Sequence, residues 1–266
     1  MELEVEQKNP DVLSTVERAL RVLSIFNEQR NEYSLHEISV KLGIPKTMAF
    51  RTLLTLETMG YVKKNEKDKT YSLGYEVFRL GKLVEKDFSL TKIVQPILQE
   101  LNHVTEETVC LVIPDKKLHR AVQILSIETK HPIKHNSNMV TVGFLHCGAA
   151  RKTILAHMEE EFIDQVIQET GLPKISDNTI TDPIELRKEL VNIKEKGYAI
   201  SKGEALKDVF SAAAPIFNYT GEIVGSIGVY LPMYRLNDNN NNEAKFIELI
   251  KRYSSKISDE LLLYKS

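Results

Sequence analysis

Apolar residues recur at helical spacing through the first sixty positions and predict three helices. The first follows the capping-box pattern Ser14-Thr-Val-Glu17, in which the two polar side chains satisfy free backbone N–H groups. Its apolar stripe comprises Val16, Ala19, Leu20, Leu23 and Phe26. The polar stretch 27–33 predicts a loop. A second capping box, Ser34-Leu-His-Glu37, opens a short helix that ends at Gly43.

The third helix begins near Pro45, runs to about Met59 and has two chemically different faces. At about 100° per residue, three apolar residues cluster on one side: Ala49, Leu53 and Leu56. Hydroxyl and basic groups occupy the opposite side: Thr47, Arg51, Thr55 and Thr58, with Lys46 and Phe50 beside them. Two helices joined by a short glycine-containing turn, the second with a polar outer face, are typical of a helix-turn-helix.

A hairpin is predicted directly after the third helix. Residues 61–64 and 70–73 have the composition of strands, and the polar segment 65–69 separates them. Three helices followed by a hairpin indicate a winged helix-turn-helix. A three-helix bundle with a decorative hairpin is the weaker alternative, because the turn, the basic face and the basic hairpin coincide.

Charge is distributed unevenly along the chain. The formal net charge is −2, yet residues 41–71 carry +4 and the remainder carries −6. This asymmetry indicates an anionic partner for one segment. Four lysines of the hairpin suit contacts to phosphate: Lys63, Lys64, Lys67 and Lys69. The outer face of the third helix suits a major groove about 12 Å wide, and Arg51 there has two open roles, base reading or phosphate binding.

A further helix and an alternating region follow. Residues 75–87 predict a helix with Val77, Leu80, Gly81 and Val84 on one stripe, either a linker that packs between protomers or an ordinary domain-edge helix. More helices are expected at about 89–105, 149–157, 159–170 and 182–196, and from Glu243 with the stripe Phe246, Ile250, Tyr253, Ile257 and Leu261. Strands are expected at 108–114, 121–127, 197–201, 210–217 and 222–231, with a polar loop at 237–242. Hairpin-linked strands flanked by helices indicate an α+β domain with an antiparallel sheet.

The sequence carries no catalytic signature, so we predict that the protein is not an enzyme and holds no metal or cofactor. GxSxG, HExxH, P-loop and GxGxxG patterns do not occur. His131 and His135 are separated by Pro132, which breaks the helix that would align them. Two cysteines, Cys110 and Cys147, make no disulfide framework, and no run of 18 apolar residues occurs. These features predict a cytoplasmic protein without a membrane span.

The segment Leu145-His-Cys-Gly-Ala-Ala-Arg-Lys152 predicts a strand end that runs through glycine and alanine into a helix. Backbone N–H groups and the helix dipole favour an anion at such a start. A ligand that bears a carboxylate would fit there. A tight turn that needs glycine for packing is the equally supported alternative.

Four ordered segments resemble the IclR family of bacterial transcription regulators over residues 12–262: TVERALRVLSIF, LHEISVKLGIPKTMAFRTLLTLETMGYV, LHCGAARKTILA and GYAISKGEALKDVFSAAAPIFNYTGEIVGSIGVYLP. The resemblance implies a winged-helix DNA-binding domain, a linker helix and a C-terminal effector domain with a GAF-like α/β fold. It also implies a homo-oligomer, dimer or tetramer, on double-stranded operator DNA, with a small organic acid as effector.

Carried over by position, the family's DNA-contacting helix falls on 46–54 and its wing on 63–71. Together with the helix-face analysis this gives the expected DNA-binding residues Lys46, Thr47, Met48, Phe50, Arg51, Thr52, Thr55, Lys63, Lys64, Lys67, Lys69 and Tyr71. The effector pocket falls on Ala149, Ala150, Ser201, Ser211, Gly228 and Tyr230.

Several pocket positions depart from the family pattern. The family usually has glycine at Arg151 and Asp208, aspartate at Ser201, often cysteine at Ser211, and serine at Gly228 and Tyr230. The exchange of two hydroxyls for one phenol changes pocket volume and hydrogen bonding. Arg151 has two open interpretations, a contact that strengthens anion binding or a salt bridge with Asp208 at the pocket mouth.

We therefore expect a regulator in four parts: an extension (1–11), a winged helix-turn-helix domain (12–74), a linker helix (75–88) and an effector-binding and oligomerisation domain (89–266). A small effector in the last part would modulate operator binding. The alternatives are a ligand-independent regulator whose C-terminal domain only oligomerises and an enzyme fused to a DNA-binding domain.

Overall fold

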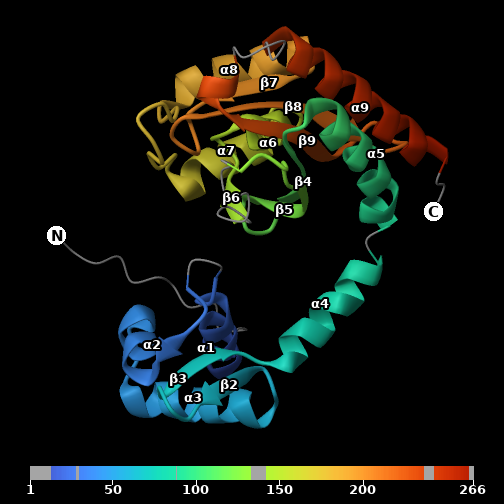
Figure 1. Cartoon of the computed structure of the whole chain (residues 1–266). Coiled ribbons are helices and arrows are strands. Elements are labelled where there is room, and N and C mark those ends of the chain that lie inside the picture. Colours follow the sequence, from blue (N-terminus) through green and yellow to red (C-terminus); the bar gives the residue numbers. More distant parts are fainter. Residues whose placement is uncertain (1–12, 28–29, 88, 133–141, 237–242, 264–266) are drawn as a thin grey trace. The chain divides into compact units, whose positions relative to one another are not determined.

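A computed structural model describes residues 13–27, 30–87, 89–132, 142–236 and 243–263 (Figure 1). Contacts divide the chain into two units, residues 1–88 and 89–266, which we describe separately. Within the described ranges, no helix has the length and apolar character needed to cross a membrane.

The N-terminal unit is a small helical domain with a three-stranded antiparallel sheet. Its elements are α1 (Ser14–Ser24), β1 (Tyr33–Ser34), α2 (Leu35–Leu42), α3 (Lys46–Thr58), β2 (Val62–Asn65), β3 (Thr70–Leu73) and α4 (Tyr75–Asp87). The strand order is β1-β3-β2. One apolar core joins the helices to the sheet and includes Val22, Ile38, Leu53 and Val62.

The two predicted capping boxes behave differently. At Ser34, the Glu37 N–H donates to Ser34 Oγ over 3.3 Å, and Glu37 Oε2 accepts the Ser34 N–H at 2.8 Å, which confirms the second box. The box at Ser14 is wrong. Leu13 is the residue at the N-cap, its carbonyl accepts the N–H groups of Val16 and Glu17, and Ser14 is already helical.

The predicted loop 27–33 also needs correction at its end. Tyr33 pairs with Tyr71, and Ser34 with Thr70, so β1 forms the third strand of the sheet. The Tyr33 ring packs on Phe26 with ring centroids 5.7 Å apart. A two-residue strand leaves no alternation to recognise, and only its partner β3 defines it.

The C-terminal unit is a layered α+β domain. Its helices are α5 (Ser89–Thr105), α6 (Ala149–Leu155), α7 (Glu160–Thr170), α8 (Pro183–Lys196) and α9 (Glu243–Leu263), with a 3₁₀ turn η2 (Met233–Arg235). Its strands are β4 (Thr108–Asp115), β5 (Arg120–Ile127), β6 (Val142–Phe144), β7 (Ala199–Lys202), β8 (Val209–Phe217) and β9 (Ile223–Pro232). They form one antiparallel sheet of order β6-β5-β4-β9-β8-β7.

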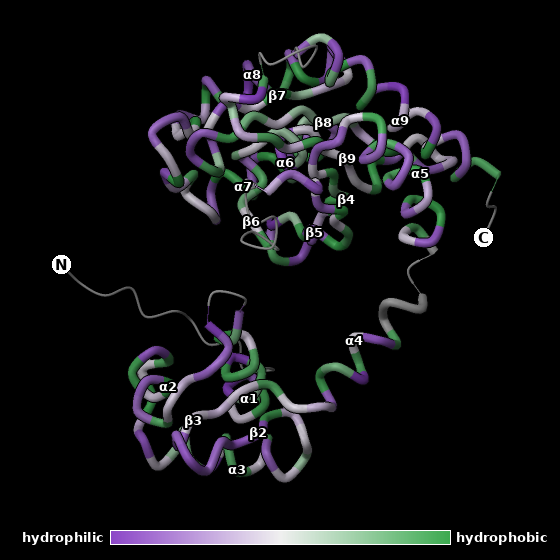
Figure 2. Tube along the Cα trace, viewed as in Figure 1, coloured by the Kyte–Doolittle hydropathy of each residue, from purple (hydrophilic) through white to green (hydrophobic). Residues whose placement is uncertain are grey.

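Helices cover both faces of this sheet because the strands are apolar on both sides. Along β4, Val109 and Leu111 pack in the core formed with α5 and α9, whereas Cys110 and Val112 pack in the core formed with α6, α7 and α8. This is the period of two that a strand imposes on its side chains. The predicted α9 stripe packs on the first face, and hydrophobic and hydrophilic stretches alternate along α9 (Figure 2). The α6 face is the one that carries a cavity.

The α+β fold with a winged helix-turn-helix is confirmed. Strand β6 was missed, because its three residues give too short a signal and pair only with β5. The predicted loop at 237–242, His135 and the side chain of Val84 lie outside the described residues.

Candidate DNA-binding and effector sites

Helix α3 presents the surface that the sequence predicted. Gly43 adopts a left-handed conformation (φ 65°) that ends α2 and turns the chain toward Pro45 and α3. The residues Ala49, Leu53 and Leu56 are buried. Lys46, Thr47, Met48, Phe50, Arg51 and Thr55 are exposed along the other side. The helix therefore offers a continuous strip of one guanidinium, one ammonium, hydroxyls and apolar groups.

Two of the expected DNA contacts are corrected by burial. Thr52 is only 8% exposed, and its hydroxyl donates to the Met48 carbonyl at 2.9 Å. Tyr71 is 4% exposed and belongs to the core of the N-terminal unit. Tyr71 is therefore not presented to a ligand outside the unit, and Thr52 exposes only a small part of its side chain beside Arg51 and Thr55. On β3, Tyr71 faces inward because strand residues alternate.

The hairpin keeps its basic character with one charge already paired. Lys63, Lys67 and Lys69 are exposed. Lys64 instead makes an ion pair with Glu66, with Nζ and Oε2 2.9 Å apart, and this contact raises the pKa of Lys64. Lys69 has φ 53°, so it supplies the left-handed residue of the turn.

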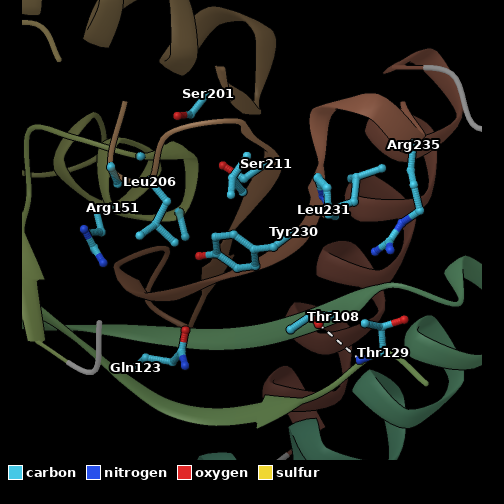
Figure 3. Close-up of a pocket in the computed structure, with 15 residues that line it drawn as sticks. Thr108, Gln123, Thr129, Arg151, Ser201, Leu206, Ser211, Tyr230, Leu231 and Arg235 are labelled. Atoms are coloured by element: carbon cyan, nitrogen blue, oxygen red, sulfur yellow. Dashed lines mark hydrogen bonds between the residues drawn. The ribbon is translucent and has the colours of Figure 1, made fainter. Parts of the chain in front are cut away.

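A row of side chains crosses four strands on the α6 face of the C-terminal sheet. Antiparallel register aligns them from strand to strand: Ser201 on β7, Ser211 on β8, Tyr230 on β9 and Thr108 on β4. All four line one cavity of about 50 Å³ (Figure 3). Gly148, Ala150, Arg151, Ala205 and Leu206 line it from α6 and from the loop after β7. The row and the helix start thus converge on one cavity.

Tyr230 fills much of this space. Its ring lies over Gly228, where an added Cβ would be 3.3 Å from Cε2 of the ring and 3.4 Å from its hydroxyl oxygen. The Cys110 thiol donates to that hydroxyl at 3.3 Å. Burial raises the pKa of Cys110 to about 11 and the pKa of Tyr230 well above 10, so both groups are neutral at pH 7.

A carboxylate does lie at the start of α6, but it belongs to the chain. The Gly148 N–H donates to Glu204 Oε2 at 3.1 Å. Lys152, only 1% exposed, donates to Glu204 Oε1 at 2.7 Å and to Glu189 Oε1 at 3.0 Å. The predicted vacant anion position at this helix start is therefore corrected.

The backbone carbonyl of Glu204 also helps to anchor the loop 203–208, which lines the cavity. Ser176 and Thr179 both donate hydroxyls to the Glu204 carbonyl, at 2.9 and 2.7 Å. Asn178 Nδ2 donates to the Lys202 carbonyl at 2.9 Å. Ala205 and Leu206 are held over the cavity by these bonds. Asp208 takes the left-handed conformation (φ 60°) in which glycine or aspartate is tolerated best.

Two guanidinium groups line the cavity, and they differ in their partners. Arg235 donates Nε to Glu107 Oε1 at 2.8 Å and Nη2 to Glu107 Oε2 at 2.5 Å. Arg151 donates Nη1 to Cys147 Sγ at 3.8 Å. Among the described residues no carboxylate is within ion-pair distance of Arg151, so the proposed salt bridge between Arg151 and Asp208 is wrong.

Comparison with known proteins identifies the chain. The family model described as the IclR helix-turn-helix domain matches residues 15–66. The model described as the bacterial transcriptional regulator IclR C-terminal domain matches residues 83–259. The chain belongs to the IclR family. Because this is a family of transcriptional regulators, the alternative of a fused enzyme is set aside.

Individual relatives share this architecture at modest identity. The transcriptional regulator BhcR of Paracoccus denitrificans is 30% identical over 85% of this chain and 80% of its own length. The transcriptional regulator KipR of Bacillus subtilis is 29% identical over 81% of this chain and 84% of its own. An IclR regulator from Silicibacter sp. TM1040 superimposes with a TM-score of 0.80 at 25% identity, over 93% and 96% of the two chains.

The six effector residues expected from the IclR resemblance overlap in part with the residues that line the cavity. Of the six expected effector residues, Ala150, Ser201, Ser211 and Tyr230 line the cavity, whereas Ala149 is buried beside it and Gly228 lies under the tyrosine ring. Sequence reasoning missed the lining residues Thr108, Gln123, Thr129, Ala205, Leu206, Val209, Leu231, Pro232 and Arg235. Thr108 would have been found from the strand register, which pairs it with Tyr230. No group of His, Cys, Asp and Glu suited to a metal occurs in the described part of this IclR chain.

Two histidines of the IclR C-terminal domain, the buried His146 and the half-buried His157, predict an acid-sensitive fold. Burial lowers the pKa of His146, whose Nε2 lies 3.1 Å from the Pro173 carbonyl, and of His157, whose Nδ1 lies 2.8 Å from the Thr153 carbonyl. Below about pH 6.5 the unfolded chain binds more protons, so stability is lost as pH falls from there toward the folded pKa values. Urea midpoints should drop between pH 7.5 and 5.5, and His157→Gln should flatten that drop. An unchanged slope in this variant would count against the assignment.

Proposed function

We propose that the chain is a DNA-binding transcriptional regulator whose operator affinity is modulated by a small anionic effector in the C-terminal unit. The carrying observation is the cavity beside loop 203–208, which is lined by two arginines. Arg235 is paired with Glu107, whereas Arg151 has no carboxylate within ion-pair distance among the described residues. An IclR homologue from Microbacterium hydrocarbonoxydans, 20% identical, has been crystallised with 4-hydroxybenzoate. That acid supports an anionic effector as a class.

In this proposal α3 enters the major groove of double-stranded operator DNA and the hairpin contacts phosphate. Arg51 and Thr47 face the base edges, while Lys63, Lys67 and Lys69 supply salt-dependent affinity. The protein acts in the bacterial cytoplasm, where its operator is found.

Oligomerisation is the second part of the proposal. Helix α4 exposes Tyr75, Phe78 and Leu83 by 85, 64 and 49%. Apolar side chains in such a row favour packing against a second copy. We therefore interpret 75–88 as a linker between a DNA-binding domain (12–74) and an effector and oligomerisation domain (89–266), in a homodimer or tetramer. An effector shifts the equilibrium between two conformations of such an assembly only if the two conformations bind it with different affinities.

Replacing Arg51 with alanine should weaken specific operator binding by about 5- to 150-fold without altering the fold. This range follows because a guanidinium that reads a base edge in the groove supplies about 1–3 kcal/mol. The operator is first selected from a genomic fragment library with the purified full chain, and affinity is then measured at two salt concentrations.

Arg79→Ala is the matched control, because it removes an exposed arginine of the same unit that pairs with Glu76 on α4. Equal affinity of Arg51→Ala and the unaltered chain would refute the role of α3. Failure to enrich any fragment would refute the regulator itself.

A ligand-independent regulator is the second candidate function. It is favoured by the small free volume of the cavity, about 50 Å³, which Tyr230 restricts. In that case the C-terminal unit only oligomerises, and no acid changes operator affinity.

A further inference from the structure

We propose that Arg151 and Tyr230 define the effector: a monocarboxylate of two or three carbons, whose carboxylate binds the Arg151 guanidinium and whose length Tyr230 limits. The inference rests on the proposed function, since it names the ligand class and the specificity-determining residues of the same cavity.

The charge of the ligand follows from the partners of the two arginines. Arg235 is neutralised by the bidentate contact to Glu107, and both residues are buried. Arg151 has the Cys147 sulfur at 3.8 Å as its hydrogen-bond acceptor, and a thiol offers weak compensation. A half-buried guanidinium in this setting favours an anion that accepts charge-assisted hydrogen bonds.

The position of the Arg151 head group is built into the sheet. A Cβ at Gly143 would lie 2.4 Å from Cζ of Arg151, 2.6 Å from Nη1 and 2.7 Å from Nε. The guanidinium therefore rests directly on the backbone of β6, in space that a side chain at position 143 would occupy. Figure 3 shows Arg151 and Tyr230 projecting into the same cavity from opposite walls, with the tyrosine hydroxyl directed toward the arginine.

The size of the ligand follows from the tyrosine. Its ring lies between Gly228 and the rest of the cavity and leaves about 50 Å³. An engineered protein cavity that binds benzene has about 150 Å³, roughly three times this volume. The remaining space suits a few heavy atoms, the size of a short acid, and excludes an aromatic ring unless Tyr230 moves.

The rest of the cavity lining suits a ligand with a single charge and a short apolar body. Leu206, Val209 and Leu231 form apolar wall, and Ser201 and Ser211 add hydroxyls. A second carboxylate would meet no second uncompensated cation in the described lining, since Arg235 is paired. Monocarboxylates are therefore preferred to dicarboxylates.

The test is a ligand-observed NMR titration of the full chain with acetate, propionate, butyrate and benzoate. Propionamide serves as the uncharged match of propionate. We expect acetate and propionate to bind more tightly than butyrate. The dissociation constants of benzoate and propionamide should be at least tenfold higher than that of propionate. Arg151→Gln should lower the affinity for propionate at least tenfold. Gly143→Ala should also weaken it, because the added methyl displaces the guanidinium without removing its charge.

Two further variants complete the design. Arg120→Gln is the matched control. Arg120 lies on β5, with its guanidinium 4.0 Å from the centre of the Phe144 ring, and it does not line the cavity. This variant should bind propionate as tightly as the unaltered chain does. Tyr230→Ser should open the cavity and admit benzoate with at least tenfold improved affinity. Circular dichroism verifies that each variant is folded.

The outcomes separate this inference from the proposed function. If acids bind the chain but Arg151→Gln leaves their affinity unchanged, or propionamide binds as well as propionate, the inference fails and an effector site remains. If benzoate binds the unaltered chain as tightly as propionate, the size limit fails. If none of the four acids binds while operator DNA does, the inferred ligand class is refuted and the DNA-binding function stands.

Discussion

Replacing Arg235 with methionine should destabilise the C-terminal unit by about 3–5 kcal/mol, the usual cost of leaving one member of a buried ion pair without its partner. Glu107 has no exposed surface, and both its oxygens accept from the Arg235 guanidinium. Burial raises the pKa of Glu107, and Arg235 opposes that rise. Without Arg235, the carboxylate must be buried alone or take up a proton.

Urea unfolding of the full chain, followed by circular dichroism, measures this loss. The double variant Glu107→Leu with Arg235→Met is the control, because it removes both charges and should recover most of the stability. The loss in Arg235→Met should also shrink as pH falls, since protonation of Glu107 removes the unpaired charge. A single variant as stable as the unaltered chain, or a double variant worse than the single, would contradict this account of the pair.

The second large effect is expected at Lys152. Lys152→Met should cost about 3–5 kcal/mol, because the Glu204 and Glu189 carboxylates lose their common cation. Glu204 is nearly buried and anchors the loop 203–208 through Gly148 and Lys152. The same variant should therefore loosen this part of the cavity lining.

Two measurements follow the consequences of Lys152→Met. Urea unfolding gives the stability loss, and amide hydrogen exchange should show faster exchange within residues 203–208. Lys188→Met is the matched control, since Lys188 makes an exposed ion pair with Glu185 on α8 and should change stability little. Normal protection of the loop in folded Lys152→Met would show that Lys152 does not anchor it.

Local patterns predicted most of the fold because its long elements carry a clear period. The stripe of α9 and the two-sided strands β8 and β9 are buried where the pattern placed them. The limits show in Ser14 and Ser34, which begin the same motif. Ser34 keeps an extended backbone (φ −73°, ψ 161°) and caps α2, whereas Ser14 lies inside α1 and cannot. Backbone conformation, and not residue type, separates the two.

The residues of a candidate site could be predicted from the sequence where they all lie on one helix or strand. Arg51 and its neighbours share one helix face, so spacing alone gave their exposure. The cavity instead depends on strand register, which brings Thr108 opposite Tyr230, and on the turn η2, which carries Arg235. Charges such as Glu204 and Lys152 are 52 residues apart, and no local pattern pairs them.

The crowding between positions 228 and 230 couples the effects of substitutions there. A Cβ at Gly228 would stand 3.3 Å from the Tyr230 ring and 3.5 Å from the Ala150 methyl group. The tyrosine ring would have to shift by a few tenths of an ångström to make room for it. The stability effects of the two positions should therefore be non-additive, and Gly228→Ser should cost more beside Tyr230 than in the Tyr230→Ser background.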